Sequence, residues 1–141
     1  MRIEIIDEKQ VLGLDFGNWL VTKVQQAMLL KIDPKKLKKW DKYFNDSEQY
    51  KSISGSNIKA EQIVLAGIHA LHCIGIDGRL LIRIRPNQFV PNLDRVVVDT
   101  TCKLINYGNI SIQGYPIFSD AFTNISENID EYIDMYVGGL I

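Results

Sequence analysis

The sequence predicts an α+β fold: a single domain over residues 1–141, with a small antiparallel or mixed sheet of about four strands and about four or five helices packed on it. Three observations predict this class. The 141 residues are about the size of one domain, and no linker or internal repeat divides them. The composition, 46% hydrophobic and 23% charged, excludes disordered and collagen-like chains. Segments of alternating and of helical apolar spacing follow one another along the chain.

The chain begins with two predicted strands and a helix. Arg2–Ile6 alternates apolar with polar residues and predicts a strand, and residues 11–16 predict its hairpin partner. From Asn18, which is a suitable N-cap, the apolar residues adopt helical spacing. A first helix is therefore expected from this residue onward.

A second helix is expected over residues 34–44. Asp33 is placed as its N-cap and Pro34 as its first helical residue. Its apolar stripe is narrow and consists of Leu37, Trp40 and Phe44. Residues 45–57 are polar, include Ser-Gly-Ser, and predict a loop.

The central segment predicts a long helix followed by a strand. Apolar residues over 58–74 gather on one helical face, and Gly75 is a natural helix stop. The Asp77-Gly78 pair is typical of a tight turn. Residues 79–85 then alternate, with Leu, Ile and Ile inward and three arginines outward, which predicts a strand.

The last third predicts a helix, a short strand and a final helix. Residues 92–107 fit either a strand or a helix closed by Gly108, and we favour the helix. Residues 110–115 predict a strand. Ser119 is expected to cap the final helix, whose apolar stripe contains Phe122, Ile125, Ile129, Tyr132, Ile133 and Tyr136. The predicted element order is ββαααβαβα.

The charge of the chain is small in total but unevenly distributed. The net charge is −1, which does not favour a dedicated nucleic-acid-binding protein. Residues 1–60 hold 11 basic and 8 acidic residues, a net charge of +3, whereas residues 61–141 hold 5 and 9, a net charge of −4. No signal peptide is recognisable, and the longest apolar stretch is too short to span a bilayer. We therefore expect a soluble cytoplasmic protein with reduced cysteines.

The clearest electrostatic feature is a basic helix. Residues 31–42 contain six lysines and two acids, a local net charge of +4. The candidate interaction residues of this helix are Lys35, Lys36, Lys38, Lys39, Trp40 and Lys42. They would suit an acidic protein surface or, without sequence preference, nucleic-acid phosphates; a solvated helix face is the simpler alternative.

A second candidate interaction surface is acidic. It consists of Glu127, Asp130, Glu131 and Asp134, placed in the C-terminal half of the final helix. The helix dipole disfavours acids there by a few tenths of a kcal/mol each, and neighbouring like charges add similar costs. The alternatives are solubility, a basic partner, or docking against the lysine helix of the same or a neighbouring chain.

Four residues are candidates for a metal site: His69, His72, Cys73 and Cys102. The first three would lie on neighbouring turns of one helix, and structural zinc needs four such ligands. The spacing matches no common zinc module, so half-buried histidines and a small apolar cysteine are the alternative. Apart from this cluster, the chain has no recognisable catalytic motif, which predicts a protein that is not an enzyme and needs no cofactor.

Residues 12–18 suggest a nucleotide-binding alternative. Asp15, Phe16 and Gly17 match the magnesium-binding triplet of protein kinases, whose other motifs are missing. The longer stretch resembles the first phosphate-binding loop of actin-like ATPases, which implies a small metal- or nucleotide-binding enzyme. The simpler alternative is that Gly17 turns the chain from a strand into a helix that Asn18 caps.

The chain also resembles small proteins encoded by phages and prophages of low-GC Gram-positive bacteria. The resemblance is carried by the Lys/Ile/Asn/Asp-rich composition and by residues 104–109 and 114–118. It implies a non-enzymatic interaction protein, either a virion-assembly component (a tail or neck accessory) or a small inhibitor of a host defence nuclease, similar to anti-CRISPR proteins, that acts by protein binding. The implied partner is a protein, which includes a second copy of this chain, and the implied location is the host cytoplasm or the virion.

Overall fold

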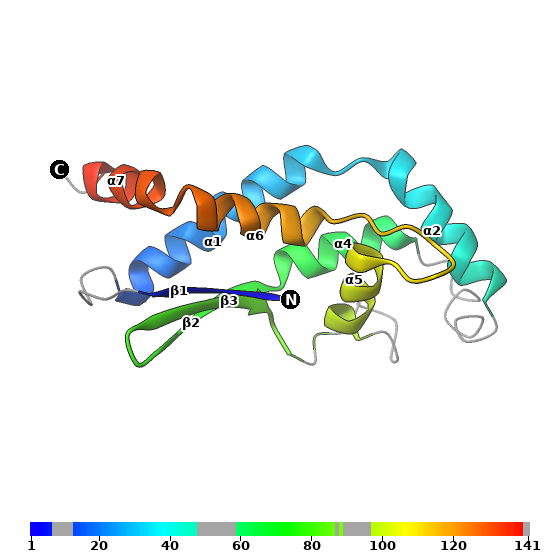
Figure 1. The fold of residues 1–141 in the computed structure, drawn as a ribbon, viewed down its shortest axis with the longest axis horizontal. Helices are drawn as coiled ribbons and strands as arrows, with labels where there is room; N and C mark the ends of the chain where they lie inside the picture. The colour runs from blue at the N-terminus through cyan, green and yellow to red at the C-terminus, as the bar shows by residue number, and fades with distance from the viewer. Residues whose placement is uncertain (7–12, 48–58, 87, 89–96, 140–141) are drawn as a thin grey trace.

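The computed structural model describes residues 1–6, 13–47, 59–86, 88 and 97–139, and within them the fold is α+β as predicted (Figure 1). This part of the chain holds three strands, one fewer than expected, and six helices. In chain order the elements are β1 (Arg2–Ile6), α1 (Gly13–Lys31), α2 (Pro34–Asp46), α4 (Ala60–His69), β2 (Leu71–Ile76), β3 (Arg79–Ile84), α5 (Val98–Tyr107), α6 (Ile117–Glu127) and α7 (Ile129–Gly139).

The sheet is antiparallel, with β3 between β1 and β2. The strands β2 and β3 form a hairpin whose two turn residues, Asp77 and Gly78, have positive φ angles of 48° and 76°. Such a turn matches the right-handed twist of the flanking strands. Side chains alternate between the faces, so Ile3, Ile82 and Cys73 share a row on the inner face.

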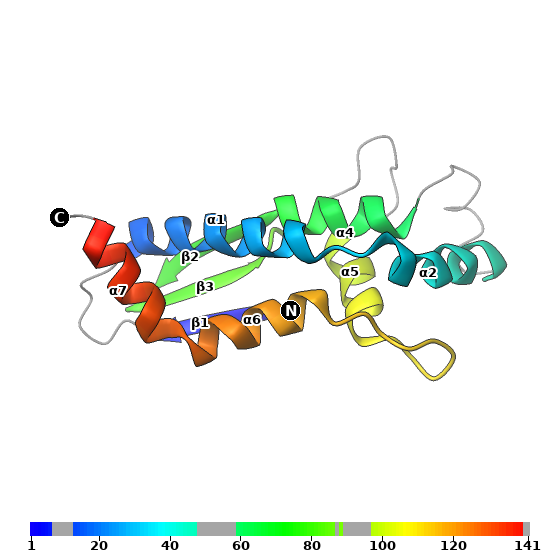
Figure 2. The ribbon, with the colours of Figure 1, turned by 90° about the horizontal axis from the view of Figure 1, so that it is seen from above.

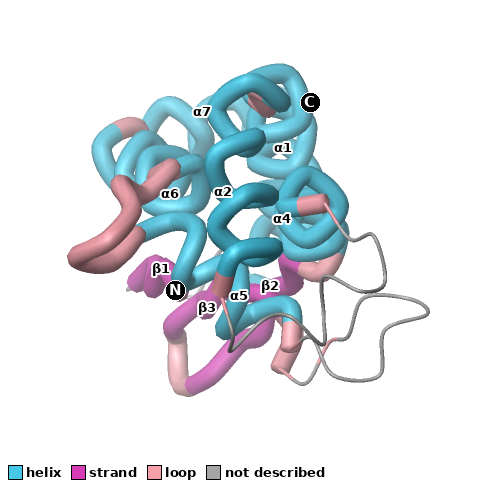
Figure 3. Tube along the Cα trace, turned by 90° about the vertical axis from the view of Figure 1, so that its right-hand side faces the viewer, coloured by secondary structure: helices cyan, strands magenta, loops and turns pink. Residues whose placement is uncertain are grey.

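The helices lie on one side of this sheet (Figure 3). α1 contacts β2 and β3, and α6 contacts β1, so these two helices cover the inner face. Phe16 and Leu20 of α1 are fully buried there, as is Ile82 of the central strand. No element of the described residues covers the opposite, outer face.

The molecule is elongated, with α2 at one end and α7 at the other (Figure 2). α2 packs on α4, and Leu37, Trp40 and Phe44 are its buried residues. One cluster of buried apolar residues nevertheless runs from these side chains to the sheet. Among the described helices, none combines the length and apolar character needed to cross a membrane.

The predicted strand over residues 11–16 is wrong from residue 13 onward, and residues 11 and 12 lie outside the described part. Gly13 is already the first residue of α1. Phe16 and Leu20 are buried on one face of that helix at a spacing of four residues, so the helical pattern begins before Asn18. Asn18 is consequently an interior, exposed residue of α1 and not its N-cap.

The predicted long helix over residues 58–74 is divided in the structure. The helix α4 ends at His69, and Leu71–Ile76 forms the strand β2. Gly75, expected to stop the helix, lies within this strand. Pairing with β3 decides the conformation, because a hairpin turn needs a strand on both of its sides.

The remaining predictions have mixed outcomes. The helix after Asp33 is confirmed, and the α5 part of the 92–107 helix is confirmed and ends at Gly108. Residues 110–115 form no strand; they contain only one isolated bridge, between Gly108 and Gln113. The loop predicted over 45–57 lies outside the described residues from 48 onward, and α2 continues to Asp46.

The predicted final helix consists of two helices, α6 and α7, separated at Asn128. Ser119 is not the N-cap of α6, because the residue before the helix is Pro116. The backbone at Asn128 has φ −118° and ψ 23°, which ends the regular helical geometry.

Candidate functional site

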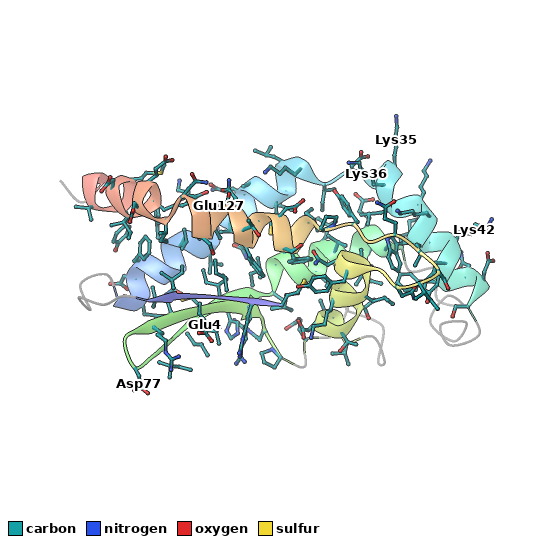
Figure 4. The ribbon with its side chains drawn as sticks, viewed as in Figure 1. Glu4, Lys35, Lys36, Lys42, Asp77 and Glu127 are labelled. Atoms are coloured by element: carbon teal, nitrogen blue, oxygen red, sulfur yellow. The ribbon has the colours of Figure 1, made fainter. Side chains whose placement is uncertain are left out.

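The sequence-predicted basic surface forms one exposed helix face. The lysine face, defined as Lys35, Lys36, Lys38, Lys39 and Lys42, lies on α2, and all five side chains are exposed. Figure 4 shows Lys35, Lys36 and Lys42 projecting from the end of the molecule that α2 occupies. α2 has this form because its apolar residues recur three or four positions apart and turn the lysines outward.

The two acids within this segment serve as helix caps. Asp33 Oδ1 accepts a hydrogen bond from the Lys35 N–H at 3.0 Å, which caps α2 as predicted. Asp41 Oδ1 accepts from the Ala60 N–H at 2.6 Å and so satisfies the start of α4. No ion pair forms between these carboxylates and the described lysines. The positive charge of the lysine face is therefore directed to solvent.

Trp40 does not belong to this surface, which corrects the sequence prediction. Its relative exposure is 0%, and it contacts the rings of Tyr43 and Phe44. Trp40 thus anchors α2 in the core and cannot stack on a nucleic-acid base. The signal was available in the sequence, because Trp40 shares its helical stripe with Leu37 and Phe44.

An open depression adjoins the lysine face. It has a volume of about 560 Å³ and lies between the end of α2 and the segment after α5, with Lys39, Lys42, Tyr43, Ser111 and Ile112 among its lining residues. The Tyr43 hydroxyl accepts a hydrogen bond from Asn109 Nδ2 at 2.9 Å, which ties that segment to α2. This depression is shallow, and its border carries Lys39 and Lys42 against Asp46, a net charge of +1 that favours an acidic group.

The acidic cluster, defined as Glu127, Asp130, Glu131 and Asp134, is also exposed. Its placement differs from the prediction, because Asp130 and Glu131 occupy the first turn of α7 and not the end of a longer helix. The helix dipole favours acids in that position. The cost from the helix dipole therefore remains only for Glu127, at the end of α6, whereas Asp130 and Asp134 are still a like-charge pair four residues apart in α7.

The lysine face and the acidic cluster do not meet within one molecule. α2 and α7 lie at opposite ends of the structure (Figure 2), and Glu127 lies on the α7 side, away from the labelled lysines (Figure 4). In the described residues the recorded ion pairs are those of Glu4 with Arg2 and Arg79. Of the predicted docking alternatives, contact within the same chain is thus not observed.

The four candidate metal ligands are dispersed. Because α4 ends at His69, the side chains of His72 and Cys73 follow strand geometry and point to opposite faces of the sheet. Cys73 packs against Gly17 of α1, and Cys102 against Gly67 of α4. No group of three or more His, Cys, Asp or Glu side chains within the described ranges could hold a metal ion.

Both thiols behave as buried apolar groups. Burial raises the pKa of the Cys73 thiol. Burial also raises the pKa of the Cys102 thiol, far above its ordinary value, and the charge of Asp99 adds to the shift. The Cys102 thiol donates to the carbonyl oxygen of Ile63 at 3.4 Å. Since the thiolate is the nucleophile and the metal ligand, these environments disfavour both roles.

The resemblance of residues 12–18 to a phosphate-binding loop is not reflected in the local structure. Asp15, Phe16 and Gly17 all lie in the first turns of α1, where Phe16 is fully buried. Gly17 allows close packing, since a Cβ at this position would collide with Cys73. Its expected role as a turn between a strand and a helix is therefore also wrong.

The arginines of the sheet are a further candidate site that the sequence analysis missed. That analysis placed the arginines of residues 79–85 outward, but only strand pairing brings Arg2 beside Arg83.

No protein-family model, curated protein or solved structure matches this chain.

Proposed function

We propose that the protein is a non-enzymatic interaction protein that assembles with other copies of itself, the lysine face of one copy receiving the acidic cluster of the next. One observation carries this proposal. The two oppositely charged surfaces are exposed at opposite ends of an elongated molecule and have no ion-pair partners among its described residues.

The geometry favours a head-to-tail contact. Complementary patches at opposite ends generate a heterologous interface, which produces rings where the rotation closes and filaments where it does not. The depression beside Lys39 and Lys42 offers a place for acidic side chains. Such assembly fits the virion-assembly role that the phage resemblance implies.

The test is the oligomeric state of charge-reversal variants. In one variant, Lys35, Lys36, Lys39 and Lys42 are changed to Glu; in the other, the four residues of the acidic cluster are changed to Lys. We expect the wild-type protein to form concentration-dependent oligomers at low salt that dissociate at high salt, and each variant alone to be monomeric. An equimolar mixture of the two variants should assemble again, because opposite charges then meet at every contact. Sedimentation velocity measures the oligomeric state of the wild-type protein, of each variant and of the mixture.

Two single charge reversals, one on the lysine face and one on another helix, provide the control. Lys42→Glu should weaken assembly, whereas Lys103→Glu, an exposed change on α5, should not. A wild-type protein that stays monomeric at low salt and high concentration would refute the proposal, as would variants that fail to assemble when mixed.

A further inference from the structure

The outer face of the sheet concentrates most of the arginines of the chain. The sequence has five arginines, at positions 2, 79, 83, 85 and 95. The pairing register places Arg2, Arg83 and His72 in one row across the three strands. Arg79 shares this face because it lies four residues before Arg83, and Arg85 continues the alternation beyond the end of β3, with its N–H donating to the Ala70 carbonyl oxygen at 2.9 Å. Four of the five arginines thus lie on one face that no described element covers.

The charge of this outer sheet face is poorly compensated. Glu4 projects below the sheet in Figure 4. Its Oε1 lies 3.8 Å from Arg2 Nη2, and its Oε2 lies 3.9 Å from Arg79 Nη1. No ion pair is recorded for Arg83 or Arg85 with any described residue. With four arginines against Glu4 and Asp77, which projects below the sheet at the β2–β3 turn (Figure 4), the described residues of the face carry a net charge of +2.

The centre of the face also has unused hydrogen-bonding capacity. Arg83 Nε and His72 Nε2 are buried and have no hydrogen-bond partner in the described part of the protein. Burial lowers the pKa of His72, and the charges of Arg85 and Arg83 lower it further, so His72 remains neutral at pH 7. A buried donor without a partner is costly, and an anion accepting hydrogen bonds from this row would offset that cost.

We propose that the outer sheet face binds the phosphate backbone of a nucleic-acid strand, with Arg2, Arg79, Arg83 and Arg85 as the phosphate-binding residues. Positions 79 to 85 of an extended strand span about 20 Å, so the site suits a linear polyanion. Guanidinium groups match phosphate oxygens in a two-pronged geometry that lysine cannot provide.

The composition of the face favours nucleic acid over an acidic protein. Protein–protein interfaces have an apolar core, whereas interfaces with nucleic acid are more polar and more positively charged. Of the apolar side chains on the described part of this face, Ile76 is exposed, Ile74 is half-buried and Leu81 is only 8% exposed, so they form no continuous exposed apolar patch beside the four arginines. No Phe, Tyr or Trp lies on the paired strands, so contacts to bases by stacking are not expected and binding should be independent of sequence.

Among the described residues, the larger acidic group of the protein lies away from this face. The acidic cluster lies on α6 and α7, on the side of the molecule away from the outer sheet face (Figures 1 and 4). The lysines of α1, Lys23 and Lys31, belong to a helix that packs on the inner face of the sheet, so variants at these two positions serve as charge-matched controls.

The experiment is a fluorescence-anisotropy titration of the full-length protein against a labelled single-stranded oligothymidine and an oligonucleotide of mixed sequence. Both should bind with similar affinity, which falls steeply between about 50 mM and about 200 mM salt. The double variant Arg83→Gln/Arg85→Gln should weaken binding at least about tenfold and reduce the slope of log affinity against log salt by about 2. Lys23→Gln/Lys31→Gln, which removes the same charge from α1, should leave binding unchanged.

A gain-of-function variant guards against misfolding. Glu4→Gln removes the acid that pairs with Arg2 and Arg79 and should tighten binding severalfold, a result that damage to the fold cannot produce. Absence of binding to either oligonucleotide would overturn the proposal, as would equal losses in the α1 variant. Equal or tighter binding of a polyglutamate peptide to the same arginines would assign the face to an acidic protein instead.

Discussion

At the scale of single residues, two glycines determine how the cysteines pack. A Cβ at Gly67 would lie 2.6 Å from Cys102 Sγ and 3.0 Å from Phe118 Cζ. Gly17 is similarly close to Cys73. Each thiol therefore fills a space that a glycine leaves open between two elements, which explains both cysteines without a metal or a catalytic role.

The contact between Gly67 and Cys102 predicts a specific coupling. Gly67→Ala should destabilise the protein by about 1–3 kcal/mol. The cost of overpacking the core with the added methyl group exceeds the gain in helix propensity from alanine. Combining it with Cys102→Ala should cost less than the sum of the two single changes, since the smaller side chain leaves room for the methyl group. Urea unfolding measures these free energies.

The control for this cycle is Gly138→Ala in α7, where a Cβ meets nothing within 4 Å. This change should be neutral or stabilising by up to about 1 kcal/mol. Strict additivity of Gly67→Ala and Cys102→Ala would contradict the described packing.

At the scale of elements, helix ends are satisfied by side chains from other helices. Asn106 of α5 has a relative exposure of 2%, and its Oδ1 accepts from the N–H groups of Phe118 at 3.0 Å and Ser119 at 3.1 Å. Asn106 Nδ2 also donates to the Ser119 hydroxyl at 3.2 Å. The first turn of α6 is thus capped from α5, and Ser119 takes part as a partner of Asn106 and not as the N-cap.

The cap predicts that Asn106 is among the polar residues to which stability is most sensitive. Asn106→Ala should destabilise the protein by about 1–3 kcal/mol, because buried N–H groups of α6 lose their acceptor. Asn106→Asp should be less damaging, since a carboxylate retains the acceptor and is favoured by the helix dipole. Chemical denaturation monitored by circular dichroism gives both values.

Asn18→Ala serves as the comparison. As an exposed residue inside α1, Asn18 should tolerate alanine without loss, whereas an N-cap would lose about 0.5–2 kcal/mol. A large destabilisation by Asn18→Ala, or none by Asn106→Ala, would be inconsistent with the helix boundaries described above.

At the scale of the whole molecule, one core joins two distant ends. Trp40 reports on the α2 end, and Trp19 reports on the other, where its ring lies 5.3 Å from that of Tyr136 in α7. The buried cluster contains residues of the sheet and of every described helix except α7. Despite the elongated shape, the molecule should therefore unfold as one cooperative unit.

The two tryptophans make this prediction measurable. In Trp19→Phe, fluorescence follows only the α2 end, and in Trp40→Phe it follows only the α7 end. Within each variant, the midpoint by fluorescence should coincide with the midpoint by far-UV circular dichroism. Separate midpoints for the two ends would show that the chain unfolds in parts.

Features that depend on local interactions could be predicted from the order of residues alone. The α+β class, β1, β3, the helix capped by Asp33 and the helix closed by Gly108 all follow from periodicity and capping within a few residues. The exposure of the lysine face follows from the same spacing.

Features that require a distant partner could not be predicted in this way and are seen only in the folded protein. Residues 71–76 are apolar enough for a helix or a strand, and pairing with β3 selects the strand. The cap at Asn106, the dispersal of the histidines and cysteines, and the row formed by Arg2, Arg83 and His72 each join segments far apart in the chain. The spacing of residues along the chain does not predict such contacts, because they stabilise the protein only after packing or strand pairing has brought the segments together.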